Sequence, residues 1–495
     1  MTKVGFVSLG CPKNLVDSEV MMGLLARDGY ELTPRADEAE VLVVNTCSFI
    51  EAAQKESVES ILEMAEHKKF GAAKKLIVAG CLVERYREQI LEQVPEVDAV
   101  VGPGEVERIL EAVHGDLRVL PREPPTFLYH DFTPRILTTP KYAAYIKIAE
   151  GCDHPCTFCI IPELRGKFRS RRFASVVREA ENLAAAGSRE ITLIGQDTTS
   201  YGEDLGLRDG LPQLLAKLAQ IEELLWVRFL YAYPNRVTQK LLDTIAEHPR
   251  LAKYIDMPLQ HASRSVLARM KRGSNGDAFL RLLERMRKTI PGVSLRTSFI
   301  VGFPGETEND FQELCDFVKE AKLDWMGVFE YSDVDNSESH ALDEKVHAAT
   351  TADRRKRLMA IQKKISRKNL REKYLGPRVR GGKHELFAAL VEGPSKDNPI
   401  VWEARLESMA PEIDGKLYLT DIELANGQVA EGGDVARVQI TRSGAYDLIG
   451  RVVEILPRPA GPAEVTDARV SATSPVPAAE KLHRIATGAP LRVLR

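Results

Sequence analysis

Short apolar runs alternate with helical patterns over the first two thirds of the chain, and this alternation constrains the fold more than any other feature. In the first part the expected strands are 4–10, 41–45, 76–80 and 97–101, with helical patterns after them. Such runs, each followed by a helix, are typical of a parallel α/β sheet. We therefore predict an open parallel α/β sheet for residues 1–135, ending in a proline-rich stretch at 121–140.

The same alternation resumes after the proline-rich stretch. Its expected strands are 143–149, 191–195, 226–231, 254–258, 295–301 and 325–331. Six β/α units over about 190 residues suit a partial TIM-like (β/α)6 barrel. A second open sheet is the alternative. This predicted domain, 138–374, ends in a long polar helix at 341–374, where residues 345–374 hold eleven Lys/Arg against two acidic residues. That charge pattern favours a solvated helix.

The pattern changes again after Gly376. From 375 to 454, short alternating runs are separated by glycine and proline turns, which predicts a small β-barrel. The last segment, 455–495, contains six prolines and many alanines, so we expect a disordered tail.

Composition excludes several classes of protein. The hydrophobic fraction of 44% is that of a globular protein, and no run approaches the ~18 apolar residues of a membrane span. The chain opens directly on a strand-like segment rather than a signal peptide, so we expect a cytoplasmic protein that binds no membrane. The formal net charge of −3 gives no whole-chain attraction for nucleic acid.

Three of the seven cysteines form a tight cluster. Cys152, Cys156 and Cys159 have the spacing C-x3-C-x2-C directly after the first expected barrel strand, at the face where TIM barrels do chemistry. Three thiolates can bind three irons of a cubane and leave the fourth iron open for a ligand. The alternative is a zinc site with His154 as fourth ligand, although the second Cys/His pair usual in such sites is missing.

Three further cysteines each follow a predicted parallel strand. Cys11, Cys47 and Cys81 stand at or just after the ends of strands 4–10, 41–45 and 76–80. Ligands of open parallel sheets gather beyond the carboxyl ends of the strands, so the three thiolates can converge on a second iron–sulfur cluster. The alternative is that they are small buried residues. We assign that structural role to Cys315, which lies within a predicted helix.

The clustered cysteines, with Phe158 before the last of them, resemble the signature of radical S-adenosylmethionine (SAM) enzymes. The resemblance implies a 4Fe-4S cluster whose open iron binds SAM. It also implies SAM contacts at the ends of the second and fifth barrel strands. At the end of the second strand the chain has Asp197 where the family usually has Glu. The cofactor-binding residues expected from the resemblance are Phe158, Gly195, Gln196, Asp197, Arg296 and Gly302.

The separated cysteines sharpen the resemblance. The segments 10–19, 45–47 and 79–81 resemble the N-terminal domain of the methylthiotransferase family, whose domain order continues with a radical SAM domain and a small β-domain called TRAM. The resemblance covers about residues 1–454. It implies two 4Fe-4S clusters, two uses of SAM, an electron donor protein and a sulfur donor. Cofactors carry such radical chemistry, so we predict no nucleophile-and-base triad.

Local motifs divide the family further. Segments 11–19, 156–162 and 410–415 resemble the branch that modifies the β-carbon of an aspartate in ribosomal protein S-12, alone or within the small ribosomal subunit. Residues 376–454 hold nine Lys/Arg against thirteen Asp/Glu, which suits a basic protein partner better than RNA. We therefore expect Glu412 and Asp414 to contact the substrate. Two alternatives remain: a tRNA-adenosine methylthiotransferase, and a non-catalytic metal-containing ribosome- or RNA-binding protein.

Overall fold

The N-terminal part of the molecule is a five-stranded, wholly parallel sheet. The computed structural model describes residues 1–115, 125–376, 385–424 and 426–457. The strands lie in the order β2-β1-β3-β4-β5. The chain first adds β2 on one side of β1 and then adds β3, β4 and β5 on the other side. This confirms the predicted open α/β sheet and adds the edge strand β2. The strands are β1 (Lys3–Ser8), β2 (Glu31–Thr33), β3 (Val41–Thr46), β4 (Lys75–Gly80) and β5 (Ala99–Val101).

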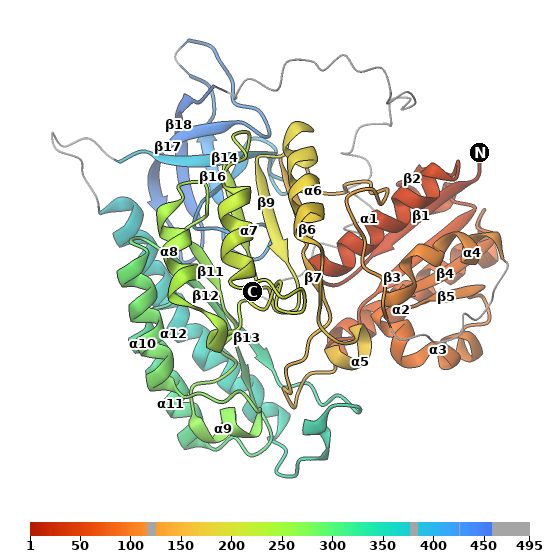
Figure 1. Ribbon diagram of the computed structural model, residues 1–495, viewed down its shortest axis with the longest axis horizontal. Coiled ribbons are helices and arrows are strands. Elements are labelled where there is room, and N and C mark those ends of the chain that lie inside the picture. The colour runs from red at the N-terminus through yellow and green to blue at the C-terminus, as the bar shows by residue number, and fades with distance from the viewer. Residues whose placement is uncertain (116–124, 377–384, 425, 458–495) are drawn as a thin grey trace.

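Helices cover both faces of this sheet because its strands alternate apolar side chains toward either side. Val43 and Ile77 belong to the core under α1 and α4, whereas Leu42 and Val78 belong to the core under α2 and α3. The face with α1 is turned toward the centre of the molecule (Figure 1). The helices are α1 (Pro12–Arg27), α2 (Glu51–Phe70), α3 (Cys81–Gln93) and α4 (Ile109–His114).

The central part is a partial barrel of six strands in chain order. Two three-stranded parallel sheets, β6-β9-β10 and β11-β12-β13, are linked by a bridge between Val227 and Leu251. The predicted (β/α)6 barrel is confirmed, with its hydrogen-bond ladder interrupted between β10 and β11. The strands are β6 (Ala143–Lys147), β9 (Glu190–Ile194), β10 (Trp226–Phe229), β11 (Tyr254–Asp256), β12 (Ser294–Val301) and β13 (Trp325–Glu330).

Helices flank the outside of the barrel (Figure 1). Their apolar faces pack on the outward side chains of the strands in one large core, for example Phe311 and Leu314 of α11 with Phe299 of β12. The helices are α6 (Phe173–Ala185), α7 (Gly210–Leu218), α8 (Gln239–Glu247), α9 (Arg264–Arg269), α10 (Gly276–Thr289) and α11 (Glu308–Ala321). The short helix α5 (Ile161–Arg165) packs instead against the N-terminal part (Figure 1). A short antiparallel pair, β7 (Ala149–Glu150) and β8 (Arg169–Ser170), brackets α5.

The long basic helix, α12 (Ala348–Leu375), is solvated on one side only. Every third or fourth residue is buried, and Gln362 donates to the carbonyl of Leu323 at 2.7 Å. The expectation of a solvated helix therefore holds for its basic face but not for this packed stripe. The buried residues are Thr351, Arg354, Leu358, Gln362, Ser366, Leu370 and Tyr374.

The C-terminal part is a closed five-stranded barrel in the order β14-β15-β16-β18-β17, as predicted. Its strands are β14 (Phe387–Pro394), β15 (Trp402–Leu406), β16 (Leu417–Asp421), β17 (Val435–Ser443) and β18 (Leu448–Ile455). The predicted disordered tail lies, from residue 458 onward, outside the described residues. Within the described ranges, none of the helices combines the length and apolar character that a membrane span requires.

The small barrel packs against the amino-terminal ends of the large barrel's strands. Tyr142, just before β6, donates to the carbonyl of Glu392 at 2.8 Å, and Trp325, the first residue of β13, donates to the carbonyl of Ser408 at 2.7 Å. The carboxyl ends of the strands point the other way (Figure 1). The end that carries the cysteine loop is therefore left open to the N-terminal sheet.

Candidate functional site

The first triad of cysteines, Cys11, Cys47 and Cys81, lies at the point of the N-terminal sheet where the chain changes from adding strands on one side of β1 to adding them on the other. They follow β1, β3 and β4, three neighbouring parallel strands, and ligands of such sheets bind beyond the carboxyl ends of the strands at that point. Gly10 has φ +88°, and a Cβ atom there would lie 2.7 Å from the Cβ atom of Cys47. Glycine thus lets the segment of Cys11 approach that of Cys47.

The thiols of this first triad are close enough to influence one another. Burial raises the pKa of the Cys47 thiol to about 12, and the neighbouring Cys81 and Cys11 add to the increase. Burial also raises the pKa of Cys81, while the guanidinium of Arg165 opposes that increase. One buried and two half-buried thiols gathered beside a guanidinium form a donor set that fits an iron–sulfur cluster, because bound metal deprotonates its thiol ligands.

The second triad lies on the loop after β6 and β7. Gly151 opens this loop at φ +76°, where a Cβ atom would lie 2.2 Å from the carbonyl oxygen of Lys167. Arg272 donates to the sulfur of Cys156 at 3.6 Å. Burial raises the pKa of Cys152 to about 11 and that of Cys159 to about 12, and in both cases the neighbouring cysteines contribute.

His154 anchors this loop. Its Nε2 atom lies 2.7 Å from Oδ2 of Asp197, and its ring stacks on Tyr233 with the centroids 3.7 Å apart. In the described part of the chain, no three or more His, Cys, Asp or Glu side chains surround a point where one metal ion could bind. A cubane has a different requirement, since each thiolate binds its own iron. The three cysteines of the loop supply one thiolate for each of three irons.

The segment 195–197 lies beside the loop of the second triad, where Asp197 contacts His154. Gln196 donates to Oε1 of Glu150 at 2.7 Å, while its own Oε1 is buried without a partner in the described residues. A buried acceptor of this kind fits a ligand amino group, such as that of SAM. The carboxylate of Asp197 is already used by His154, Thr199 and Ser200, so this side chain positions the cysteine loop.

Phe158 and Gly302 lie together at the carboxyl end of β12. Phe158 packs against an apolar cluster that includes Phe303 and Met270. Gly302 has φ +76° and donates its backbone N–H to Glu306 at 2.6 Å. Burial raises the pKa of Glu306 to about 7, although Arg354 and the backbone N–H groups of Phe303 and Gly302 oppose the increase. These residues shape the wall of the site that the resemblance assigned to SAM.

Asp414 requires a correction. Arg296, the third residue of β12, pairs through its guanidinium with Asp256 at 2.7 Å and with Asp414 at 3.4 Å. The side chain of Asp414 is 1% exposed and also accepts from the hydroxyl of Tyr254 at 2.6 Å. The predicted substrate contact of Asp414 is wrong, because its side chain is buried and pairs with Arg296 between the two barrels. The SAM contact of Arg296 stays a prediction. Glu412 is exposed.

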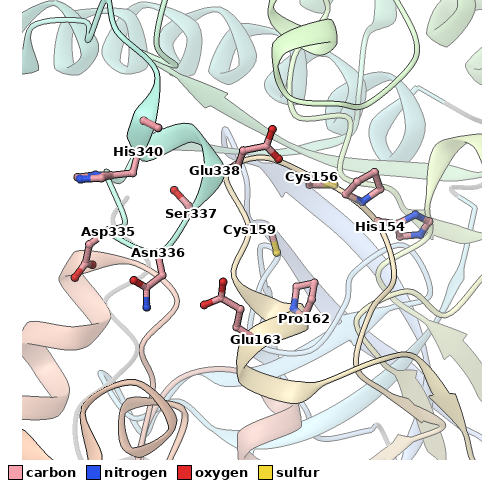
Figure 2. A pocket seen from close by; sticks show the side chains of 12 residues that line it. His154, Cys156, Cys159, Pro162, Glu163, Asp335, Asn336, Ser337, Glu338 and His340 are labelled. Carbon is pink, nitrogen blue, oxygen red and sulfur yellow. The ribbon is translucent and has the colours of Figure 1, made fainter. Parts of the chain in front are cut away.

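A cavity of about 470 Å³ opens beside the second triad. Figure 2 shows Cys156, Cys159 and His154 on one side and the segment from Asp335 to His340 on the other. Asp335 is held in place by Arg85 of α3 at 2.5 Å. The cavity is therefore bounded by both the barrel and a segment that the N-terminal sheet supports.

A buried charge network joins the N-terminal sheet to the barrel. Arg165 of α5 donates to Asp17 of α1 at 3.1 Å and to Glu150 at 3.0 Å, and Lys147 donates to the same two carboxylates. Burial alone would raise the pKa of Glu150, but Arg165 and Lys147 hold it well below its usual range. The network fixes the position of the first triad relative to the second.

Several residues at the site had no assigned role in the sequence. Arg165 and Lys13 stand within family motifs that assign them no role, and no sequence pattern marks Arg272 or Tyr233. Lys13 is 8% exposed, and its Nζ atom lies 3.5 Å from the ring centroid of Tyr231 and 3.4 Å from the carbonyl oxygen of Gly195. Each acts across a domain boundary or a long sequence separation, which no local spacing reveals.

Comparison with known proteins adds an independent finding. Three family models match successive parts of the chain: Uncharacterized protein family UPF0004 over residues 3–102, the Radical SAM superfamily over 146–318 and the TRAM domain over 385–453. The radical SAM methyltransferase TsrM from Kitasatospora setae, a solved structure, is 17% identical with a TM-score of 0.49, covering 67% of this chain and 75% of its own.

Relatives match nearly the whole chain. The protein named Ribosomal protein uS12 methylthiotransferase RimO from Solibacter usitatus is 61% identical over 454 residues, covering 91% of this chain and 95% of its own. The protein of the same name from Koribacter versatilis is 55% identical over 496 residues, covering 91% of this chain and 96% of its own.

Proposed function

The chain belongs to the RimO family of ribosomal protein uS12 methylthiotransferases, and we propose that it adds a methylthio group to the β-carbon of one aspartate in that protein, which is the S-12 protein of the sequence analysis. It is a radical SAM enzyme, and the family implies a 4Fe-4S cluster and SAM. The second cluster, at Cys11, Cys47 and Cys81, is part of the proposal.

One observation carries the proposal: residues of both cysteine triads adjoin the short helix α5. Cys81 packs against Ile160 and Leu164, and Ile160 directly follows Cys159. Arg165, at the end of the same helix, lies beside Cys81. A substrate group between the triads can be reached from both, which is what replacement of a hydrogen by a methylthio group requires.

The bound groups would supply radical removal of a hydrogen from an unactivated carbon and delivery of a methylthio group, which side chains alone cannot perform. The chain's own residues bind and orient. Cys152, Cys156 and Cys159 would hold the radical-forming cluster, with Arg272 donating to the Cys156 sulfur. Gln196 offers an acceptor for the SAM amino group. His154 and Asp197 keep the loop in place.

The partners follow from this chemistry. We propose an electron donor protein, a sulfur donor and, as substrate, the ribosomal protein alone or within the small subunit in the cytoplasm. Exposed Glu412 and the excess of acids over 376–454 suit a basic partner, because opposite surface charges attract and orient it. Glu412 lies on the small barrel, away from the cysteine loops, so it would assist docking rather than touch the reacting aspartate.

The test is peptide mass spectrometry of purified S-12 protein after reaction with anaerobically reconstituted enzyme, SAM, sulfide and a reductant. We expect one aspartate to gain the mass of a methylthio group in place of one hydrogen. The same reaction is run with unmodified tRNA. Methylthiolated adenosine in the tRNA and unmodified S-12 protein would overturn the proposed substrate while leaving the radical SAM assignment intact.

A further inference from the structure

Lys13 crosses from the N-terminal sheet into the space between the two triads. It lies two residues after Cys11, in the first turn of α1, yet its contacts are with the barrel. Its ammonium lies 3.5 Å from the ring centroid of Tyr231, just after β10, and 3.4 Å from the carbonyl oxygen of Gly195, just after β9. It therefore stands at the carboxyl end of the barrel, beside the segment assigned to SAM.

This ammonium is buried and has no carboxylate partner in the described part of the chain. Lys13 is 8% exposed, and among the described residues no carboxylate lies within 4.0 Å of its Nζ atom. Its charged form is favoured by Tyr231 and Cys11, and the ammonium still has donor capacity that a ligand carboxylate at this end of the barrel can use. Other buried cations of the barrel do have carboxylate partners: Lys147 with Asp17 and Glu150, Arg165 with the same pair, Arg228 with Glu190, and Arg296 with Asp256. Arg272 has none within 4.0 Å among the described residues, but it donates to the sulfur of Cys156 and to the carbonyl of Pro258.

We propose that Lys13 binds the side-chain carboxylate of the target aspartate. The inference rests on the proposed function, and it adds the residue that recognises the reacting group. The hydrogen is removed from the same carbon that then receives the sulfur. That β-carbon is bonded directly to the carboxylate carbon of the aspartate side chain. An ammonium between the triads would fix that carbon in place and keep the carboxylate ionised.

The first experiment uses the wild-type holoenzyme. The dissociation constants of S-12 protein and of its variant with asparagine in place of the target aspartate are measured by competition. Asparagine keeps the shape of the side chain but removes its charge. A hydrogen bond between charged groups is worth enough to weaken binding by roughly 10- to 100-fold when that charge is lost. Equal binding of the two proteins overturns the inference.

The second experiment removes the ammonium. In Lys13→Met the preference for the aspartate form should fall to near unity, whereas Lys13→Arg, which keeps the charge, should retain much of it. Lys167→Met is the matched control: Lys167 lies on the exposed loop after α5, and its loss removes one positive charge near the site without touching Lys13. It should keep the wild-type preference.

Other roles for Lys13 give different results. If Lys13→Met weakens binding of SAM by the same factor, the ammonium serves SAM and the inference is wrong. If the variant loses iron while Lys13→Arg shows no preference for aspartate over asparagine, Lys13 only supports the cluster and the inference is again wrong. If wild-type enzyme modifies tRNA and not S-12 protein, the proposed function itself has failed. If it modifies S-12 protein but binds the asparagine form equally well, only the inference has failed.

Discussion

At the scale of single residues, the glycines beside the cysteines matter as much as the cysteines. Gly10 and Gly80 have φ +88° and +96°, a region that favours glycine, and each precedes a cysteine of the first triad. A Cβ atom at Gly80 would lie 2.4 Å from the carbonyl oxygen of Thr46. The approach of three strand ends therefore depends on positions that cannot carry a side chain.

Replacing Gly10 by alanine tests this dependence. Gly10→Ala adds both backbone strain and a contact of 2.7 Å with the Cβ atom of Cys47, so the first triad should no longer assemble. We expect iron to fall from about eight to about four per chain, the content of one cubane. Gly29→Ala is the control, because Gly29 has φ +91° but nothing within 4 Å of its Cβ position. Equal iron in the two variants would contradict the account.

The sequence revealed these cysteines because each stood at a strand end, and strand ends could be read from apolar runs. The sequence did not reveal which long-range partners a strand residue has inside the barrel. Arg296 was assigned to SAM for its strand alone, and Asp414 to the surface for its charge. Their partners come from β11 and the small barrel, and such long-range pairs have no local signal. The contacts of Lys13 with Tyr231 and Gly195 are also long-range and have no local signal.

At the scale of elements, α1 is the joint between the N-terminal sheet and the barrel. Its face toward the barrel carries buried polar residues, including Asp17 and Glu19. Glu19 is fully buried and accepts from Arg135 at 2.6 Å and from the backbone N–H of Thr138 at 2.7 Å. The segment 135–138 leads into β6, so these bonds tie α1 to the first strand of the barrel.

Removing the Glu19 carboxylate should therefore destabilise the whole chain. Glu19→Ala leaves the buried guanidinium of Arg135 with Glu179 as its one remaining carboxylate. Breaking a buried ion pair on one side costs about 3–5 kcal/mol. Denaturant unfolding should show a loss in that range, against at most about 0.5 kcal/mol for Glu63→Ala on the exposed face of α2. Similar losses in both variants would show that the pair is not structural.

At the scale of the whole molecule, the two ends of the large barrel contact different parts of the chain. The carboxyl end carries the second cysteine triad and faces the N-terminal sheet, which carries the first, and the amino end is closed by the small barrel (Figure 1). Buried charges at this second end, Arg405 with Glu190 at 2.6 Å and Arg296 with Asp414, hold the two barrels together. The proposed docking surface on the small barrel therefore lies at the opposite end of the large barrel from the cysteine loop.

This junction should make stability depend on pH through Asp414. Burial raises the pKa of Asp414 to about 6, although Arg296 and the Tyr254 hydroxyl oppose the increase. The folded state then binds more protons than the unfolded one between about pH 4 and 6. Its contribution is fully present below pH 4 and is lost as the pH rises through 6, by up to about 3 kcal/mol.

Unfolding of wild type and of Asp414→Asn at pH 4.5 and pH 7 measures this contribution. The free energy of unfolding of the variant, relative to wild type, should be higher at pH 7 than at pH 4.5. The exposed substitution Asp343→Asn should show no such difference. A relative stability of Asp414→Asn that is independent of pH would mean that Asp414 ionises as it does in the unfolded chain.

The central claim is that the two triads serve different steps of one reaction. The direct measurement compares 5′-deoxyadenosine and methylthiolated S-12 protein formed by the triple variant Cys11→Ala, Cys47→Ala, Cys81→Ala under reducing conditions. With the loop at 152–159 intact, the account predicts continued release of 5′-deoxyadenosine, about four irons per chain and no methylthiolated product. Normal amounts of product from this variant would contradict it.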